Sequence, residues 1–154
     1  MKKGKKATGS SRKSKKPVQK RRTRALIPLI SKKENNKELV GQACLGSDEV
    51  IVLLVVDTEA MPGQFGFAAS DIGHGNGLMR EVKMMVEQKG KECNDLMEWG
   101  DTETKVVHLI QLRGIDKVVL LKQDNQFFKK LVKSIGAQTK ASVELVKVVE
   151  EEQA

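Results

Sequence analysis

The sequence has few of the residue types from which a function is usually read. Its 154 residues include two cysteines, two histidines, one tryptophan and no tyrosine. Cys44 and Cys93 form no Cys-x-x-Cys pair and belong to no Cys/His cluster, which argues against a disulfide framework and predicts that no metal is bound. Cys44 stands on an apolar segment and is expected to pack in the core.

Long apolar runs and catalytic groupings are also missing. No apolar segment is long enough to span a membrane, and "ALIPLI" (25–30) is shorter than the hydrophobic part of a secretory signal. The sequence contains no Ser-His-Asp or Cys-His arrangement and no paired carboxylates at a strand end. We therefore expect a cytoplasmic protein that is not an enzyme and has no membrane partner.

Acidic residues are absent from the first 24 positions, which hold 12 of the 28 lysines and arginines. The other 130 residues carry 16 basic and 20 acidic side chains, so a tail of charge +12 precedes a body of charge −4. Charge repulsion and the lack of core-forming residues predict a disordered basic tail over residues 1–24, followed by a folded domain over residues 25–150.

A tail of this charge binds polyanions by releasing their counterions. It has no aromatic residue on which bases could stack, so it is not expected to read a nucleic-acid sequence. The predicted contacts to DNA or RNA are Lys13, Lys15, Lys16, Lys20, Arg21, Arg22 and Arg24. The alternative is a solubilising tail without a dedicated partner.

The body alternates between strand-like and helix-like segments. "EVIVLLVVD" (49–57) and "DKVVLL" (116–121) are continuous apolar runs, which are typical of strands buried on both faces of a sheet. The predicted strands are 25–30, 49–57, 93–99, 116–121 and 142–149, and the predicted helices are 34–46, 77–90, 100–114 and 124–136. This order favours an α/β, Rossmann-like fold with a five-stranded, mostly parallel sheet and helices on both faces.

Over residues 25–149 this pattern resembles the universal stress protein family. The similarity is strongest in "EWGDTETKVVHLIQLRGIDKVVLL", where the family has a strand, Gly-Asp, a helix and a step into a buried strand. "ALIPLIS" is similar to the family's first strand, and "VIVLLVVD" to its second strand with a terminal acid, Asp57. The resemblance implies the strand order 3-2-1-4-5, a role in the stress response and dimers formed through the last strand.

Two positions depart from the ATP-binding members of that family. Ser31 stands where those members have an aspartate at the end of the first strand. The family's glycine motif after the fourth strand is replaced by "KQDNQFFKKLVKSIG", in which the first glycine is Gly136. The sequence therefore predicts weak ATP binding or none, and no cofactor, although another nucleotide stays possible.

A glycine-rich stretch, "GHGNG" (73–77), follows the second strand after a long predicted loop over 58–76. Its spacing differs from the dinucleotide-binding fingerprint, and it does not follow its strand directly. One interpretation is a flexible crossover leading into a helix. The other is a lid or an anion-binding nest in which Gly75 and Gly77 allow close approach.

Lysines follow two strands that meet at the predicted switch point of the sheet. Lys32 and Lys33 come after the first strand, and Lys122 comes after the fourth. Together with the start of the helix at 124–136, they could hold a phosphate without glycines. Asp124 argues against this site because its side chain could cap that helix, and the alternative is a set of solvated loop lysines.

The last predicted strand, "SVELVKVV" (142–149), is an apolar edge. Val143 and Leu145 face one side of the sheet, and Val146 and Val148 face the other. Such an edge favours pairing with another strand, and the predicted dimer interface is Val143, Leu145, Val146 and Val148. The edge could instead be covered by the C-terminal residues or by the basic tail.

Three functions are consistent with these features. The first is a non-enzymatic binding or regulatory module of the universal stress protein type. The second is a nucleic-acid-associated protein that acts through its basic tail. The third is a nucleotide binder with a divergent site built from Lys32, Lys33 and Lys122.

Overall fold

The computed structural model describes residues 22–59 and 67–148. Most of the predicted tail, including Lys13, Lys15, Lys16, Lys20 and Arg21, lies outside these residues. The first strand begins at Arg24, within the stretch predicted as tail. Within the described part of the chain, no helix is long and apolar enough to cross a membrane.

Five parallel strands form the body of the sheet in the order β4-β2-β1-β5-β6. Their bounds are β1 (Arg24–Pro28), β2 (Glu49–Asp57), β4 (Glu92–Trp99), β5 (Lys117–Leu121) and β6 (Ser142–Val146). This confirms the predicted α/β class and the predicted order of these strands. A further strand of two residues, β3 (Phe67–Ala68), pairs with the end of β2.

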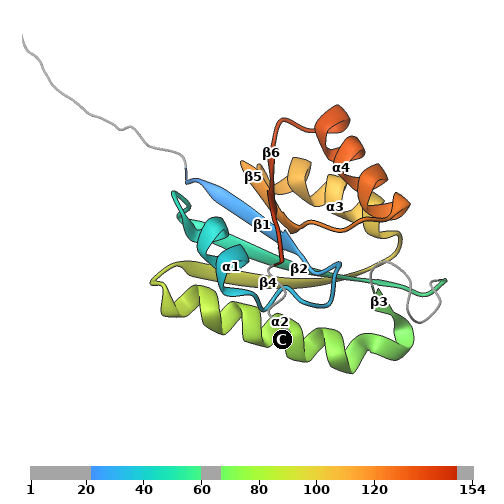
Figure 1. Cartoon of the computed structure of the whole chain (residues 1–154), viewed down its shortest axis with the longest axis horizontal. Coiled ribbons are helices and arrows are strands. Elements are labelled where there is room, and N and C mark those ends of the chain that lie inside the picture. The colour runs from blue at the N-terminus through green and yellow to red at the C-terminus, as the bar shows by residue number, and fades with distance from the viewer. Residues whose placement is uncertain (1–21, 60–66, 149–154) are drawn as a thin grey trace, which may run out of the picture.

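The helices cover both faces of the sheet (Figure 1). One face carries α1 (Lys37–Cys44) and α2 (Ile72–Gln88), and the other carries α3 (Thr102–Arg113) and α4 (Gln126–Gln138). Each face has its own apolar core, so β2 is buried on both sides from Glu49 to Val56, as its continuous apolar run predicted.

Side-chain caps begin three of these helices, and a left-handed glycine ends one of them. Asn36, Asp101 and Asn125 act as N-caps, each accepting a hydrogen bond from the backbone N–H three residues later. Gly114 ends α3 in the left-handed conformation, with φ of 62°. The cap of α4 is therefore Asn125, and Asp124 precedes it.

The glycine-rich segment differs from its prediction. Residues 58–76 were expected to be a loop, but residues 67–71 form β3 and a 3-10 helix, η1 (Ala69–Asp71), and α2 begins at Ile72. Gly73, Gly75 and Gly77 therefore lie inside a helix. Glycine lowers intrinsic helix propensity, which is why the sequence pattern placed the helix start too late. Residues 60–66 of the predicted loop lie outside the described residues.

Candidate functional site

The carboxyl edge of the sheet has a closed half next to β1. β3 pairs with the last two residues of β2, whereas β1 pairs with β2 only as far as Leu53. Because β4 occupies the other edge of β2, β3 lies on the β1 side, beyond the carboxyl end of β1. Phe67 of β3 is fully buried there. The space at the end of β1 and β2 is thus filled by the chain itself.

Lys32 forms an ion pair and a cation–π contact within this closed half. Its backbone is left-handed, with φ of 68°, and its Nζ lies 3.3 Å from Oδ2 of Asp71 and 5.4 Å from the ring centre of Phe67. The backbone N–H of Ala68 and the ammonium group of Lys32 lower the pKa of Asp71. Lys32 is therefore engaged with the start of α2, and it does not join the other predicted anion-binding lysines.

Gly75 has a packing role in the closed half. A Cβ at this position would lie 2.9 Å and 3.0 Å from the two methyl carbons of Leu54 and 3.3 Å from the Phe67 ring. These distances are shorter than normal carbon–carbon contacts, so only glycine allows α2 to approach the sheet here. A Cβ at Gly77 would meet nothing within 4 Å. Neither glycine lines the cavity that Lys33 and Lys122 share, which is described below.

Glu34 is a buried carboxyl group at the end of β1. Its Oε2 accepts hydrogen bonds from Ile30 N at 3.2 Å, Ser31 N at 2.8 Å and Ser31 Oγ at 2.6 Å. Its Oε1 is buried and has no hydrogen-bond partner among the described residues. Burial raises the pKa of Glu34, and the hydrogen bonds from Ser31 and Ile30 oppose that rise.

The other half of the edge, between β1, β5 and β6, is open. A cavity of about 420 Å³ lies there, which we call the lysine cavity. Its residues follow the carboxyl ends of all three strands and include Ser31, Lys33, Lys122, Gln123, Asp124 and Lys147. The structure thus brings Lys33 and Lys122 together, as predicted, and adds Lys147. None of these three lysines forms an ion pair with a described residue.

Two polar side chains complete the wall of the lysine cavity. The side-chain nitrogen Nε2 of Gln123 is buried and donates no hydrogen bond within the described part of the chain. The Asp124 carboxylate is 98% exposed and lies 3.7 Å from Nζ of Lys129. Since Asn125 supplies the helix cap, Asp124 does not cap α4, which removes the objection drawn from the sequence. The cavity can therefore hold an anion that also accepts a hydrogen bond from an amide.

A second cavity of about 680 Å³ lies beside the first, between α4 and β6. We call it the α4–β6 groove. It shares Lys122, Gln123 and Asp124 with the lysine cavity and adds Phe128, Lys129, Val132, Lys133 and Leu145. The groove is therefore the apolar continuation of the lysine cavity along α4.

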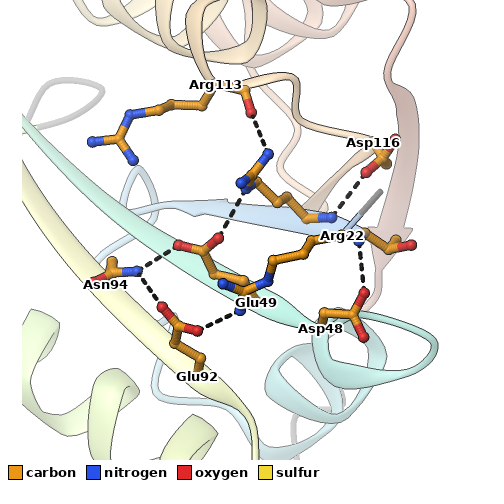
Figure 2. Close-up of polar contacts among 9 residues, drawn as sticks. Arg22, Asp48, Glu49, Glu92, Asn94, Arg113 and Asp116 are labelled. Carbon is orange, nitrogen blue, oxygen red and sulfur yellow. Dashed lines mark hydrogen bonds and ion pairs between the residues drawn. The ribbon is translucent and has the colours of Figure 1, made fainter. Parts of the chain in front are cut away.

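The amino edge of the sheet carries charged groups that are paired with one another (Figure 2). Glu49 is almost fully buried and accepts hydrogen bonds from Nε of Arg24 at 2.9 Å and from Asn94. Arg22 forms an ion pair with Glu92. Arg22 and Arg24, which the sequence predicted as nucleic-acid contacts, are thus placed against acidic residues of β2 and β4.

The residues predicted as a dimer interface lie on the last strand, which is an open edge of the sheet. Val143 packs partly against the α3–α4 core, and Val146 and Val148 pack partly against the α1–α2 core. Leu145 is 45% exposed on the α4 side. The predicted alternation of these side chains between the two faces is therefore confirmed.

The fold is that of the universal stress proteins. The sequence matches no protein-family model and no curated protein. The solved structures that are similar include a universal stress protein from Archaeoglobus fulgidus in complex with dAMP, at TM-score 0.58 and 12% identity, covering 80% of this chain and 96% of that one.

Two other universal stress protein structures are similar to a comparable degree. One is in complex with cAMP, at TM-score 0.58 and 12% identity, covering 83% of this chain and 98% of that one. The other, from Arabidopsis thaliana, has AMP bound; its TM-score is 0.56 at 15% identity, covering 81% of this chain and 91% of that one.

Three residues of the edge were missed by the sequence argument. Lys147 follows a strand just as Lys33 and Lys122 do, but the strand was predicted to continue to residue 149. Gln123 carries no signal of its own in the sequence. Glu34 is the first residue of the helix predicted over 34–46, and nothing nearby in the sequence indicates that its side chain is buried.

Proposed function

We propose that the protein is a non-enzymatic regulatory module that binds the phosphate group of a nucleotide in the lysine cavity. The observation that carries this proposal is the meeting of Lys33, Lys122 and Lys147 at the carboxyl ends of three parallel strands. Ligands of parallel α/β sheets bind at this edge, where the strand order reverses. Three ammonium groups that form no ion pair among the described residues, together with a buried amide donor, suit a phosphate.

Two further observations support a nucleotide as the ligand class. The universal stress protein structures described above are complexes with dAMP, cAMP and AMP. The lysine cavity has the size of an ordinary small-molecule site. Ser31 and the glycine-free segment after β5 still predict weak binding of ATP, with a dissociation constant above about 1 μM.

Calorimetric titration of the full chain with AMP, ATP and inorganic phosphate tests this proposal. Replacing Lys33 and Lys122 together by alanine should weaken AMP binding at least about tenfold, which corresponds to about 1.4 kcal/mol. Lys89→Ala changes an exposed lysine at the opposite end of the sheet and should have no effect. Absence of AMP and phosphate binding, or binding that ignores the double substitution, would refute the proposed site.

A second candidate function is polyanion binding through the N-terminal residues. Ten lysines and arginines and no acid precede Arg22. Arg22 and Arg24 are engaged with Glu92 and Glu49, so we propose that any contact to DNA or RNA comes from residues 1–21. The stronger case for the folded domain itself is nucleotide binding, because its site lies among described residues.

We also propose that the protein is a homodimer paired through β6. Ser142 N bonds to Asp116 O and Val146 O accepts from Lys122 N, so these two residues face β5. By alternation, the N–H groups of Val143 and Leu145 face the open edge. Val143→Pro removes one of these donors without breaking the β5–β6 ladder. Light scattering at micromolar concentration should show a dimer for the native chain and a shift toward monomer for the variant.

A further inference from the structure

The direction in which a ligand can extend from the lysine cavity follows from the two halves of the carboxyl edge. On the β1–β2 side, β3 occupies the space beyond β1, Phe67 is fully buried, and Lys32 is tied to Asp71. The α4–β6 groove is continuous with the cavity on the opposite side, because the two share Lys122, Gln123 and Asp124. Among the described residues, the α4–β6 groove is therefore the direction in which a ligand can extend beyond the lysine cavity.

The chemistry of the groove differs from that of the lysine cavity. Val132 and Leu145 supply apolar surface at its wall, and Phe128 lies buried beneath α4. Leu145 is 45% exposed, so its side chain is accessible from the groove. Lys129 and Lys133 line the same groove. This combination suits a flat, apolar ring whose edge carries hydrogen-bond acceptors.

Gln123 lies where the two cavities meet. Its Nε2 is buried and without a hydrogen-bond partner among the described residues, a state that costs about 1–3 kcal/mol. A polar atom of a ligand that passes from one cavity to the other would satisfy this donor. A sugar hydroxyl is such an atom, because the sugar of a mononucleotide lies between its phosphate and its base.

We propose that the α4–β6 groove is the nucleobase subsite of a mononucleotide whose phosphate lies in the lysine cavity. This proposal rests on the proposed function and adds to it the position of the base. Binding then has two separable contributions: the charge is held by Lys33, Lys122 and Lys147, and the ring is held by apolar contact with Val132 and Leu145.

The two contributions can be separated with two probes and two matched variants. Leu145→Ser removes apolar surface from the groove, and Leu112→Ser removes a leucine that is 66% exposed on α3. AMP and inorganic phosphate are titrated into the native chain and both variants. Leu145→Ser should weaken AMP binding at least about tenfold and leave phosphate binding unchanged, whereas Leu112→Ser should change neither. Thermal melting confirms that each variant keeps its fold.

A labelling experiment locates the base directly. Irradiation of the full chain with 8-azido-AMP, followed by mass spectrometry of its peptides, should label residues between 126 and 148. Labelling of residues 67–75, or AMP affinity that Leu145→Ser leaves unchanged, would overturn the base position while the phosphate site stands. If the native chain binds neither AMP nor phosphate, the proposed function fails and the subsite with it.

Discussion

The two ends of the parallel sheet differ in whether their basic side chains form ion pairs. At the amino end, Arg22 and Arg24 pair with Glu92 and Glu49 (Figure 2), so that each buried or half-buried charge has a partner. At the carboxyl end, Lys33, Lys122 and Lys147 line one cavity without forming ion pairs among the described residues. The paired charges at the amino end therefore stabilise the fold, whereas these three lysines have no such partner among the described residues.

The energetic reason for this difference is burial. Glu49 is 4% exposed, and a carboxylate at that depth must be compensated by an opposite charge and hydrogen bonds. Lysines at strand ends keep their ammonium groups near water and need no partner to be stable. The comparison predicts that substitutions of the paired residues at the amino end change stability, whereas substitutions of Lys33, Lys122 and Lys147 change binding.

The largest expected effect is on DNA affinity, and it is expected from the basic residues that precede Arg22, not from Arg22 itself. Deleting residues 1–21 removes ten positive charges and should reduce affinity for duplex DNA at least about a hundredfold at low salt. Each lost phosphate contact should also reduce the slope of log K against log salt concentration by about 0.9. Arg22→Ala should change affinity little, since its guanidinium group is paired with Glu92. Fluorescence anisotropy at several salt concentrations measures both, and strong DNA binding by the shortened chain would contradict this assignment.

Arg24→Ala should be the most destabilising change at the amino end. Among the described residues, it leaves the buried Glu49 carboxylate with Asn94 as its one side-chain hydrogen-bond partner, and it removes the hydrogen bond from Nη1 to Arg113 O at 3.3 Å. We expect a loss of about 3 kcal/mol in the free energy of unfolding, measured with urea. Adding Glu49→Gln to the same chain should recover part of that loss, and AMP binding should be unaffected.

Gly75 and Gly77 give a matched pair of substitutions in one helix. Gly75→Ala should destabilise by about 1 kcal/mol, because the strain against Leu54 and Phe67 exceeds the gain in helix propensity. Gly77→Ala meets nothing within 4 Å and should stabilise by up to about 1 kcal/mol. If instead both substitutions weakened phosphate binding and left stability unchanged, the glycines would be part of an anion nest.

Glu34 gives the smallest expected effect, a change in the pH dependence of stability. Burial raises the pKa of Glu34 in the folded protein. At pH values between the unfolded-state and folded-state pKa, the folded protein therefore holds a proton that the unfolded chain has released. The contribution of Glu34 to stability is therefore complete at acidic pH and is lost as the pH rises through the folded-state pKa. Glu34→Gln should flatten this part of the stability curve, as measured by urea unfolding from pH 4 upward; an unchanged slope would show that another group titrates.

Much of the fold followed from patterns that are local in the sequence. The continuous apolar run of β2 and the alternation of strands with helices were each readable from nearby residues in the sequence. Those features predict the α/β class because backbone geometry and hydrophobic period are set by near neighbours. The meeting of Lys33 with Lys122 also followed, since the carboxyl ends of parallel strands share one edge.

The remaining features depend on contacts between residues far apart in the chain. Position 75 of α2 requires glycine because Leu54 and Phe67 leave no room for a Cβ. These contacts come from distant parts of the chain, so no local sequence pattern reveals them. Lys32 is turned toward Asp71, 39 positions later, while its neighbour Lys33 lines the cavity. Side-chain packing decides such outcomes, so only the tertiary structure shows which half of the carboxyl edge is closed and which is open to a ligand.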